Sequence, residues 1–235
     1  MTKEEIKEVL KLHKLWIESN GIEGGRAYIK NVNLVDCDLT SADLSYADLI
    51  NCDLAYANLK KANLSYANLA YCNLYSADLS YANLINCDLA YCNLRYANLS
   101  YAKLFKTKLI RANLMYADLR HCNLGYPDLS YADLRHCNLL NADLSYADLR
   151  HCNLAGADLS DCNLEYSDLS YADLIDCNLA YANLKKANLS YADLSYANLK
   201  KANLSGANLS DAKINDMLNQ VMIRKVRFKR RNVKK

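Results

Sequence analysis

The sequence predicts one elongated rod of stacked repeats with a short segment at each end. The main observation is a five-residue period that runs without insertion through 38 units, centred on Ile29, then on Leu at every fifth position from Leu34 to Leu209, and finally on Ile214. A small residue, usually Ala or Cys, precedes each centre by two positions. Internal repeats of this kind decide the architecture of a chain before any local pattern does.

A period of five excludes a long helix and a flat strand, which repeat about every 3.6 and about every 2 residues. A chain that buries two positions in every five has to turn regularly and coil. Leu and the small residue are expected to face inward. The Asp or Asn between them is expected to face outward beside a corner, where it bonds to nearby backbone. The period alone fixes neither the number of sides nor the hand.

The individual units add a family resemblance. Residues 42–46, 57–61 and 202–206 are Ala-Asp-Leu-Ser-Tyr, Ala-Asn-Leu-Lys-Lys and Ala-Asn-Leu-Ser-Gly, and they closely resemble the pentapeptide repeat family over about four-fifths of the chain. The resemblance implies an all-β fold, a right-handed quadrilateral β-helix with four units per coil. The units would then make about nine coils and, at about 4.8 Å per coil, a rod roughly 45 Å long.

Three segments follow from these patterns: an N-terminal capping helix and linker (1–27), the repeat rod (28–214), and a C-terminal cap with a basic tail (215–235). Residues 2–19 have helical periodicity, with a capping box at Thr2 and Glu5 and a stop at Asn20-Gly21. This helix is expected to cover the open edge of the first coil. We expect His13 on its apolar face to be packed rather than to bind a ligand.

The C-terminal segment predicts a second, short helix and a cationic tail. The helix rests on apolar residues at helical spacing, namely Ile214, Met217, Leu218, Val221 and Met222. In the family that the chain resembles, members that bind topoisomerases are often dimers through this end, so a homodimer contact is an expectation here. The tail is a candidate for binding an anionic partner through Arg224, Lys225, Arg227, Lys229, Arg230 and Arg231. Its alternative is a solvated segment that keeps the protein soluble.

Charge and hydropathy indicate the compartment. The net charge is +3, but residues 28–213 carry 16 basic and 20 acidic side chains, whereas residues 214–235 carry eight and one. The acidic start of the chain does not resemble a secretory signal, and no stretch approaches the roughly 18 apolar residues of a membrane span. We therefore expect a cytoplasmic protein.

All ten cysteines occupy the small inward position, so we expect buried thiols. With four units per coil, Cys52, Cys72 and Cys92 share one column at a spacing that permits disulfides. A reducing cytoplasm favours thiols, and zinc needs ligands that converge rather than stack. A metal or redox role of this column stays open.

No catalytic constellation is apparent, and no cofactor is implied. His121, His136 and His151 are 15 residues apart, which places them on three different faces. Each is followed by an inward Cys, so Cys–His catalysis is excluded because the two side chains diverge. Fifteen of the 20 acidic residues in the repeats precede Leu, spread over four faces without a concave pocket. Seventeen of the 19 tyrosines follow Leu by two positions, which predicts aromatic ladders that stiffen the rod.

One irregular stretch predicts a partner patch. Lys103 and Lys108 replace the usual Asp or Asn, and Thr107 takes an inward position. Phe105 is expected to stack over Ile85, and Arg111 above Tyr91. An exposed apolar pair rimmed by cations suits a protein partner, although ordinary drift of the repeat would give the same pattern. The candidate residues are Ile85, Tyr91, Lys103, Phe105, Lys106, Lys108, Ile110 and Arg111.

These observations predict a non-enzymatic, rigid scaffold for protein–protein interaction. The family resemblance implies an alternative, a DNA mimic that binds and protects bacterial DNA gyrase or topoisomerase. A duplex about 45 Å long would carry roughly 26 negative charges, whereas residues 28–213 have a net charge of −4. A further alternative is a rod tethered to nucleic acid or to an anionic membrane by its basic tail.

Overall fold

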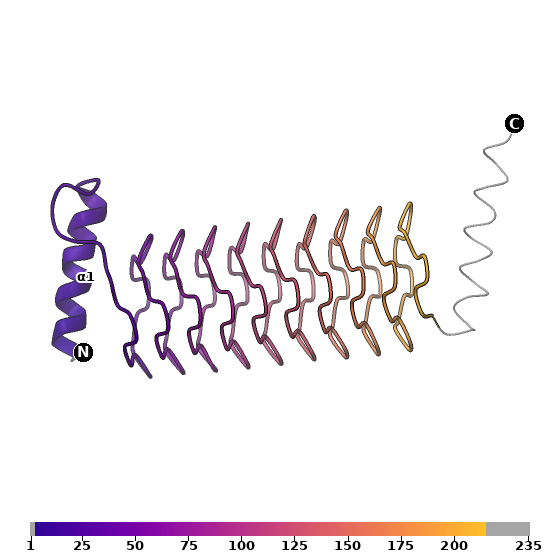
Figure 1. Ribbon diagram of the computed structural model, residues 1–235, viewed down its shortest axis with the longest axis horizontal. Helices are drawn as coiled ribbons and strands as arrows, with labels where there is room; N and C mark the ends of the chain where they lie inside the picture. The colour runs from indigo at the N-terminus through magenta and orange to yellow at the C-terminus, as the bar shows by residue number, and fades with distance from the viewer. Residues whose placement is uncertain (1–2, 215–235) are drawn as a thin grey trace, which may run out of the picture.

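A computed structural model describes residues 3–214 (Figure 1). Within this range one helix, α1 (Lys3–Glu18), lies across the N-terminal end of a straight stack of coils. The chain then advances coil by coil along a single axis, so α1 and the last described coil lie at opposite ends of the rod (Figure 1). The capping residue Thr2 and the predicted C-terminal helix and tail lie outside the described residues.

Helix α1 confirms the N-terminal helix and its stop signal. Asn20 and Gly21 both have positive φ, and the Gly21 N–H donates to the Trp16 carbonyl at 2.7 Å. The Asn20 N–H donates to the Ile17 carbonyl at 3.2 Å, which completes the Schellman pattern that ends many helices. Gly24 then lets the linker return against the helix, because a Cβ there would lie 2.2 Å from the Leu12 carbonyl oxygen.

The rod is built from parallel bridges between residues that are 20 apart, from Tyr28–Asp48 to Asp193–Lys213. Four five-residue units therefore complete one coil. The expected β-strands need a correction: in the described residues each is reduced to a single bridge residue, since corners occupy the rest of so short a unit. The coils are joined by backbone hydrogen bonds that recur at every unit, such as Leu44 N–H to Asn63 O at 2.7 Å and Asn63 N–H to Ala42 O at 2.9 Å.

Every corner is a turn whose second residue has left-handed backbone geometry. The two residues after each Leu form the turn, and the following N–H bonds back to Leu, as from Ala47 to Leu44 at 3.0 Å. The non-glycine residues at the second position have φ between 53° and 63°. Tyr is the commonest residue at this position, although it seldom adopts this geometry, because a left-handed residue costs roughly 1–2 kcal/mol. The repeated bonding of its N–H to the next coil, as from Tyr46 to Ser65 at 2.9 Å, holds it there.

The Asp and Asn residues fix each corner from outside, as the sequence predicts. The side-chain oxygen of Asp43 accepts the N–H of Ser45 at 3.0 Å, and this bond recurs from unit to unit. Asn adds a bond between coils: the Asn63 amide donates to Asp43 at 3.1 Å, and Asn83 donates to Asn63 at 3.0 Å. Asp cannot make this second bond, because its carboxylate only accepts.

The core is one continuous column of Leu with Ala or Cys, as predicted from the two inward positions. Leu54 to Leu194 are almost completely buried, whereas Leu204 and Leu209 in the last described coil are only half-buried. The inward Pro127 lacks the N–H that would close the turn on Leu124, and the chain bends there without that bond. The C-terminal end of the described rod thus presents a partly open core.

At the N-terminal end, His13 joins α1 to the first coil, confirming that it is packed. Its side chain is fully buried, its Nδ1 accepts the Ala27 N–H at 3.1 Å, and its ring stacks on Trp16 with centroids 5.7 Å apart. Burial lowers the pKa of His13, although the Ser45 backbone and the Asp43 carboxylate oppose this. Protonation of His13 would put a hydrogen on Nδ1, where it would face the Ala27 N–H instead of accepting from it. The contact therefore requires a neutral histidine.

We predict that docking of α1 weakens in acid. Because the folded-state pKa is lowered, the contribution of His13 is fully present above its ordinary pKa of about 6.5 and declines as the pH falls below that value. Hydrogen exchange of the α1 amides should be faster at pH 5.5 than at pH 7.5, after correction for intrinsic rates. A His13→Gln variant, which keeps an acceptor but does not titrate, should lose most of this difference. An equal pH response in both proteins would contradict the assignment.

Candidate interaction surfaces

The ten inward cysteines are free thiols, and eight of them donate a hydrogen bond to a backbone carbonyl inside the core. Cys52, Cys72 and Cys92 donate their S–H to the carbonyl of the residue 23 positions earlier, at 2.7, 3.0 and 2.9 Å. Burial raises the pKa of Cys52 to about 11 and that of Cys122 to about 12, and raises that of Cys92 well above its usual range. Cys52, Cys92 and Cys122 therefore stay protonated and unreactive near neutral pH. In the described residues no cluster of three or more His, Cys, Asp or Glu side chains could hold a metal ion.

We predict that only one thiol reacts readily in the folded protein. Cys37 in the first coil is half-buried, whereas the other nine cysteines are buried. With a thiol reagent such as 5,5′-dithiobis(2-nitrobenzoate) at pH 8, Cys37 should react first and the others only as fast as the rod unfolds. A Cys37→Ala variant should lose the fast phase. Rapid modification of further thiols in that variant would contradict the burial of the column.

The three histidines of the repeats lie in three separate aromatic stacks, as their spacing predicts. His121, His136 and His151 stack on the tyrosine one coil below, with centroids 4.7, 5.0 and 4.8 Å apart. Gly156 lies above His136. A larger residue would not fit there, because a Cβ would lie 2.5 Å from the imidazole Nδ1. The histidines thus belong to the ladders and form no common site.

The outward tyrosines form the predicted ladders along the corners of the rod. Rings on successive coils are nearly parallel, with interplanar angles of 1–7° between tyrosines, and their centroids are 4.6–5.1 Å apart. Stacking covers the ring faces and leaves the edges in solvent, so a nucleobase could reach only the ends of a stack. The ladders stiffen the rod and are not a base-binding platform.

Each of the three histidine units also contains an ion pair that the sequence analysis missed. Arg120, Arg135 and Arg150 each bind the Asp two residues earlier in a bidentate manner, with shortest distances of 2.6–2.7 Å. The hydrogen bonds from Arg120 hold the pKa of the Asp118 carboxyl below its usual value. The sequence does contain a signal for these ion pairs, because Asp-Leu-Arg precedes His-Cys in all three units.

The structure brings the apolar residues of the predicted partner patch close to the surface, but it does not leave them fully exposed. Ile85, Phe105 and Ile110 are half-buried. Phe105 meets Tyr126 edge-on with centroids 5.6 Å apart, and Gly125 leaves room for its ring. The inward Thr107 is fully buried, with Oγ1 2.8 Å from two backbone carbonyls. The apolar side chains of the patch are therefore packed into the rod surface. We call the surface formed by Ile85, Phe105 and Ile110 the wall around Phe105.

The cations of the patch have local partners. Lys106 lies over the Phe105 ring at 5.4 Å, and Lys108 pairs with Asp88 at 3.4 Å. The Arg111 guanidinium packs over Tyr131 on the next coil at 5.3 Å, rather than over the expected Tyr91, because the side chain extends toward the C-terminal end. Lys103 and Tyr91 are exposed on the same stretch.

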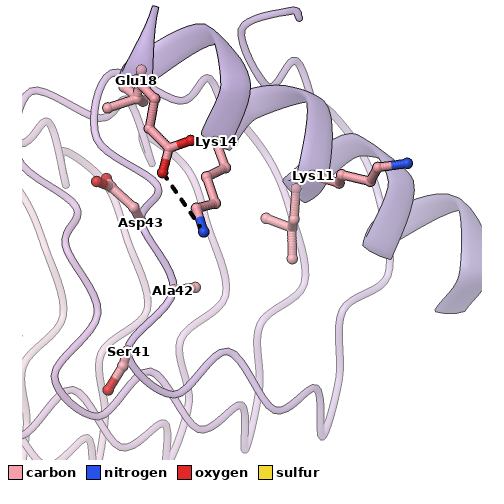
Figure 2. Close-up of a pocket in the computed structure, with 8 residues that line it drawn as sticks. Lys11, Lys14, Glu18, Ser41, Ala42 and Asp43 are labelled. Atoms are coloured by element: carbon pink, nitrogen blue, oxygen red, sulfur yellow. Dashed lines mark ion pairs between the residues drawn. The ribbon is translucent and has the colours of Figure 1, made fainter.

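A shallow groove between α1 and the first coil was not predicted (Figure 2). It has a volume of about 470 Å³, and Leu10, Ile17 and Ala42 supply its apolar lining. Lys14 and Glu18, both on α1, pair along the helix side of the groove at 3.6 Å, and Asp43 lies on the coil side (Figure 2). The pair is largely exposed to solvent and gives no perturbed group for chemistry. The groove is a gap that α1 leaves against the first coil.

Comparison with known proteins places this architecture in a family. The model of pentapeptide repeats matches residues 26–125 and 128–216, and the break falls at Tyr126-Pro127, where the turn bond is missing. The chain belongs to the pentapeptide repeat family. The rod of this pentapeptide repeat protein is accordingly a right-handed β-helix solenoid. Among the described residues no helix is long and apolar enough to span a bilayer.

Several solved structures are similar to this pentapeptide repeat protein. HetL from the cyanobacterium Nostoc sp. strain PCC 7120, involved in heterocyst differentiation regulation, is 36% identical over 86% of this chain and 96% of its own, with a TM-score of 0.47. Rfr23 from the cyanobacterium Cyanothece 51142 is 37% identical over 38% and 60%, with a TM-score of 0.38. A trypsin-treated variant of QnrB1, a plasmid-mediated fluoroquinolone resistance protein, is 16% identical over 86% and 97%, with a TM-score of 0.50. No curated protein matches the sequence.

Proposed function

We propose that this pentapeptide repeat protein is a non-enzymatic scaffold that holds a protein partner against the wall around Phe105. The observation that carries the proposal is the packed setting of Phe105, between Tyr126, Gly125 and Lys106, in a stretch where two successive units, at Lys103 and Lys108, have lysine in place of the usual Asp or Asn. Elsewhere in the described rod the polar groups serve the fold: Asp and Asn hold corners, and the buried thiols donate to carbonyls. Half-buried apolar side chains beside cations are typical of interface centres.

The remaining features of the proposal follow from the same fold. Ten free thiols suit a reducing compartment, so we place the protein in the cytoplasm. We divide the chain into the cap and linker, 1–27, the rod, 28–214, and the C-terminal segment, 215–235. A homodimer through the C-terminal end stays a prediction, because residues 215–235 lie outside the described residues.

Gyrase or topoisomerase is the second candidate partner, and an excess of acidic residues in one part of the rod favours it. Residues 112–180 contain eleven acidic and three basic residues. On the most acidic face, however, Asp48, Asp88 and Asp148 pair with Lys30, Lys108 and Arg150 at 2.8, 3.4 and 2.6 Å. Such pairing neutralises much of the charge with which a rod would imitate a duplex, so we rank this function below the scaffold.

We predict that a partner captured by the immobilised protein is lost when the wall is made polar. Phe105→Ser and Ile110→Ser should each weaken binding by at least about 10-fold, the usual cost of removing a hot-spot side chain. Ile50→Ser is the matched control, because Ile50 is a half-buried isoleucine in the same column as Ile110, three coils earlier. Equal capture by all four proteins would contradict the assignment of the wall. Capture of gyrase or topoisomerase subunits by all four would support the second candidate instead.

A further inference from the structure

The first coil has an open edge, because no earlier coil lies against it. Elsewhere in the rod each Asp or Asn before Leu bridges the residue 20 positions earlier, and two backbone bonds close the bridge. The Asp48 N–H donates to Ala27 O at 2.9 Å, and Asp48 O accepts the Ile29 N–H at 2.8 Å. Among residues 3–214, the Asp and Asn residues before Leu that lack both of these bonds are Asn33, Asp38 and Asp43. An open edge of this kind can pair with a further strand.

Helix α1 covers this edge but leaves a groove at Asp43. The groove lies between the C-terminal half of α1 and residues 41–43 of the coil (Figure 2), and its volume of about 470 Å³ is in the range of protein binding sites. Ala42 is only half-buried there, whereas Ala62, which follows it in the same inward column, is buried. All lining residues lie within 3–214, and those of α1 begin at Leu10, about 10 Å along the helix from Lys3.

The open edge is also acidic. Residues 31–47 contain no basic side chain and three acidic ones, Asp36, Asp38 and Asp43. On the helix side of the groove, Lys14 pairs with Glu18 at 3.6 Å rather than with Asp43 (Figure 2). Within the described residues Asp43 has no ion-pair partner, so a cation that enters the groove meets an uncompensated carboxylate.

We propose that the groove binds an extended peptide segment of a protein partner, which runs parallel to residues 42–44 and adds one bridge at Asp43. In this mode of binding, main-chain hydrogen bonds supply affinity, and the side chains that alternate along the peptide supply specificity. The wall around Phe105 lies three coils further along the rod. The inference therefore goes beyond the proposed function and does not rest on it.

The register of the rod fixes the pattern of the peptide. The carbonyl of its first residue accepts the Asp43 N–H, and the side chain of this residue is small and apolar because it lies on Ala42, against Leu10 and Ile17. The second residue lies opposite Asp43 and faces outward. The third residue donates its N–H to Asp43 O, as Ile29 donates to Asp48, and it is small because the neighbouring Leu44 is already buried.

The rod itself shows which side chain suits the second position. Where Lys takes the place of Asp or Asn, it pairs with the Asp one coil away: Lys108 with Asp88 at 3.4 Å, and Lys213 with Asp193 at 2.9 Å. A Lys or Arg of the peptide has the same relation to Asp43. The partner segment is therefore small apolar, basic and small in sequence.

Methylation of single peptide nitrogens tests the main-chain pairing. The probe is acetyl-Ser-Val-Lys-Ala-Ser-amide, titrated into full-length protein labelled with ¹⁵N, and the Asp43 amide resonance should shift to saturation. A methyl group on the Ala nitrogen removes the donor to Asp43 O and should weaken binding at least about 10-fold. A methyl group on the Lys nitrogen, which faces away from the edge, should weaken it less than about 3-fold, because no hydrogen bond to the rod is lost. Equal effects of the two methyl groups, or no saturating shift at about 1 mM peptide, would overturn the proposal.

Asp143 supplies a matched control for Asp43, because it lies on the same face five coils further along. Both carboxylates accept the N–H of the serine two residues later, at 3.0 and 3.1 Å, and asparagine keeps this acceptor. The Asp143 N–H, however, is already bonded to Cys122 O at 2.9 Å. Asp43→Asn should weaken binding of the probe about 3-fold, the usual range of an exposed ion pair, and Asp143→Asn should leave it unchanged. Equal effects of the two substitutions would contradict the placement at Asp43.

A second copy of the chain is the competing occupant of the groove. The amide resonances of Asp43 and Leu10 in the protein alone should not change on dilution. If both shift on dilution, the groove is an interface between copies, and the peptide assignment is overturned. The Phe105→Ser and Ile110→Ser variants should bind the probe as the parent does, so failure of peptide binding would leave the scaffold function untouched.

Discussion

The left-handed corner is the constraint on which the rest of this molecule depends. Each unit turns through a residue with positive φ, and the turn returns the chain to the core after five residues. Four such turns bring the backbone to the point where a residue bridges the one 20 positions earlier. The corner itself is unfavourable for most side chains, at roughly 1–2 kcal/mol. It persists because the corner N–H bonds to the next coil, and neighbouring corners reinforce one another.

Once the 20-residue register is set, every column of the sequence becomes a physical ladder. Asn above Asp gives an amide-to-carboxylate bond, Tyr above Tyr gives a ring stack, and Cys gives an S–H bond to the core backbone. The polar and aromatic side chains of these ladders are therefore already engaged in bonds or stacks within the rod. The binding surface that we propose lies where a column is interrupted, as at Phe105.

The five-residue period was enough to predict the inward positions, the ladders and the separation of the three histidines, and helical spacing predicted the N-terminal helix. It was not enough to predict the corner, because Tyr is disfavoured at positive φ and only the assembled coils overrule that preference. It also could not show which way a long side chain extends: Arg111 reaches Tyr131 on the following coil, not Tyr91.

The most direct test of this account is the free energy of unfolding of two variants at one exposed corner. Lys61 has a φ of 60° and is exposed, and no aromatic ring or carboxylate among residues 3–214 is paired with it, so a substitution there reports mainly on the backbone. Lys61→Gly should be as stable as the parent or up to about 1 kcal/mol more stable, whereas Lys61→Val should be about 1–2 kcal/mol less stable. A valine variant as stable as the glycine variant would contradict the left-handed corner, and with it the coil that the corner builds.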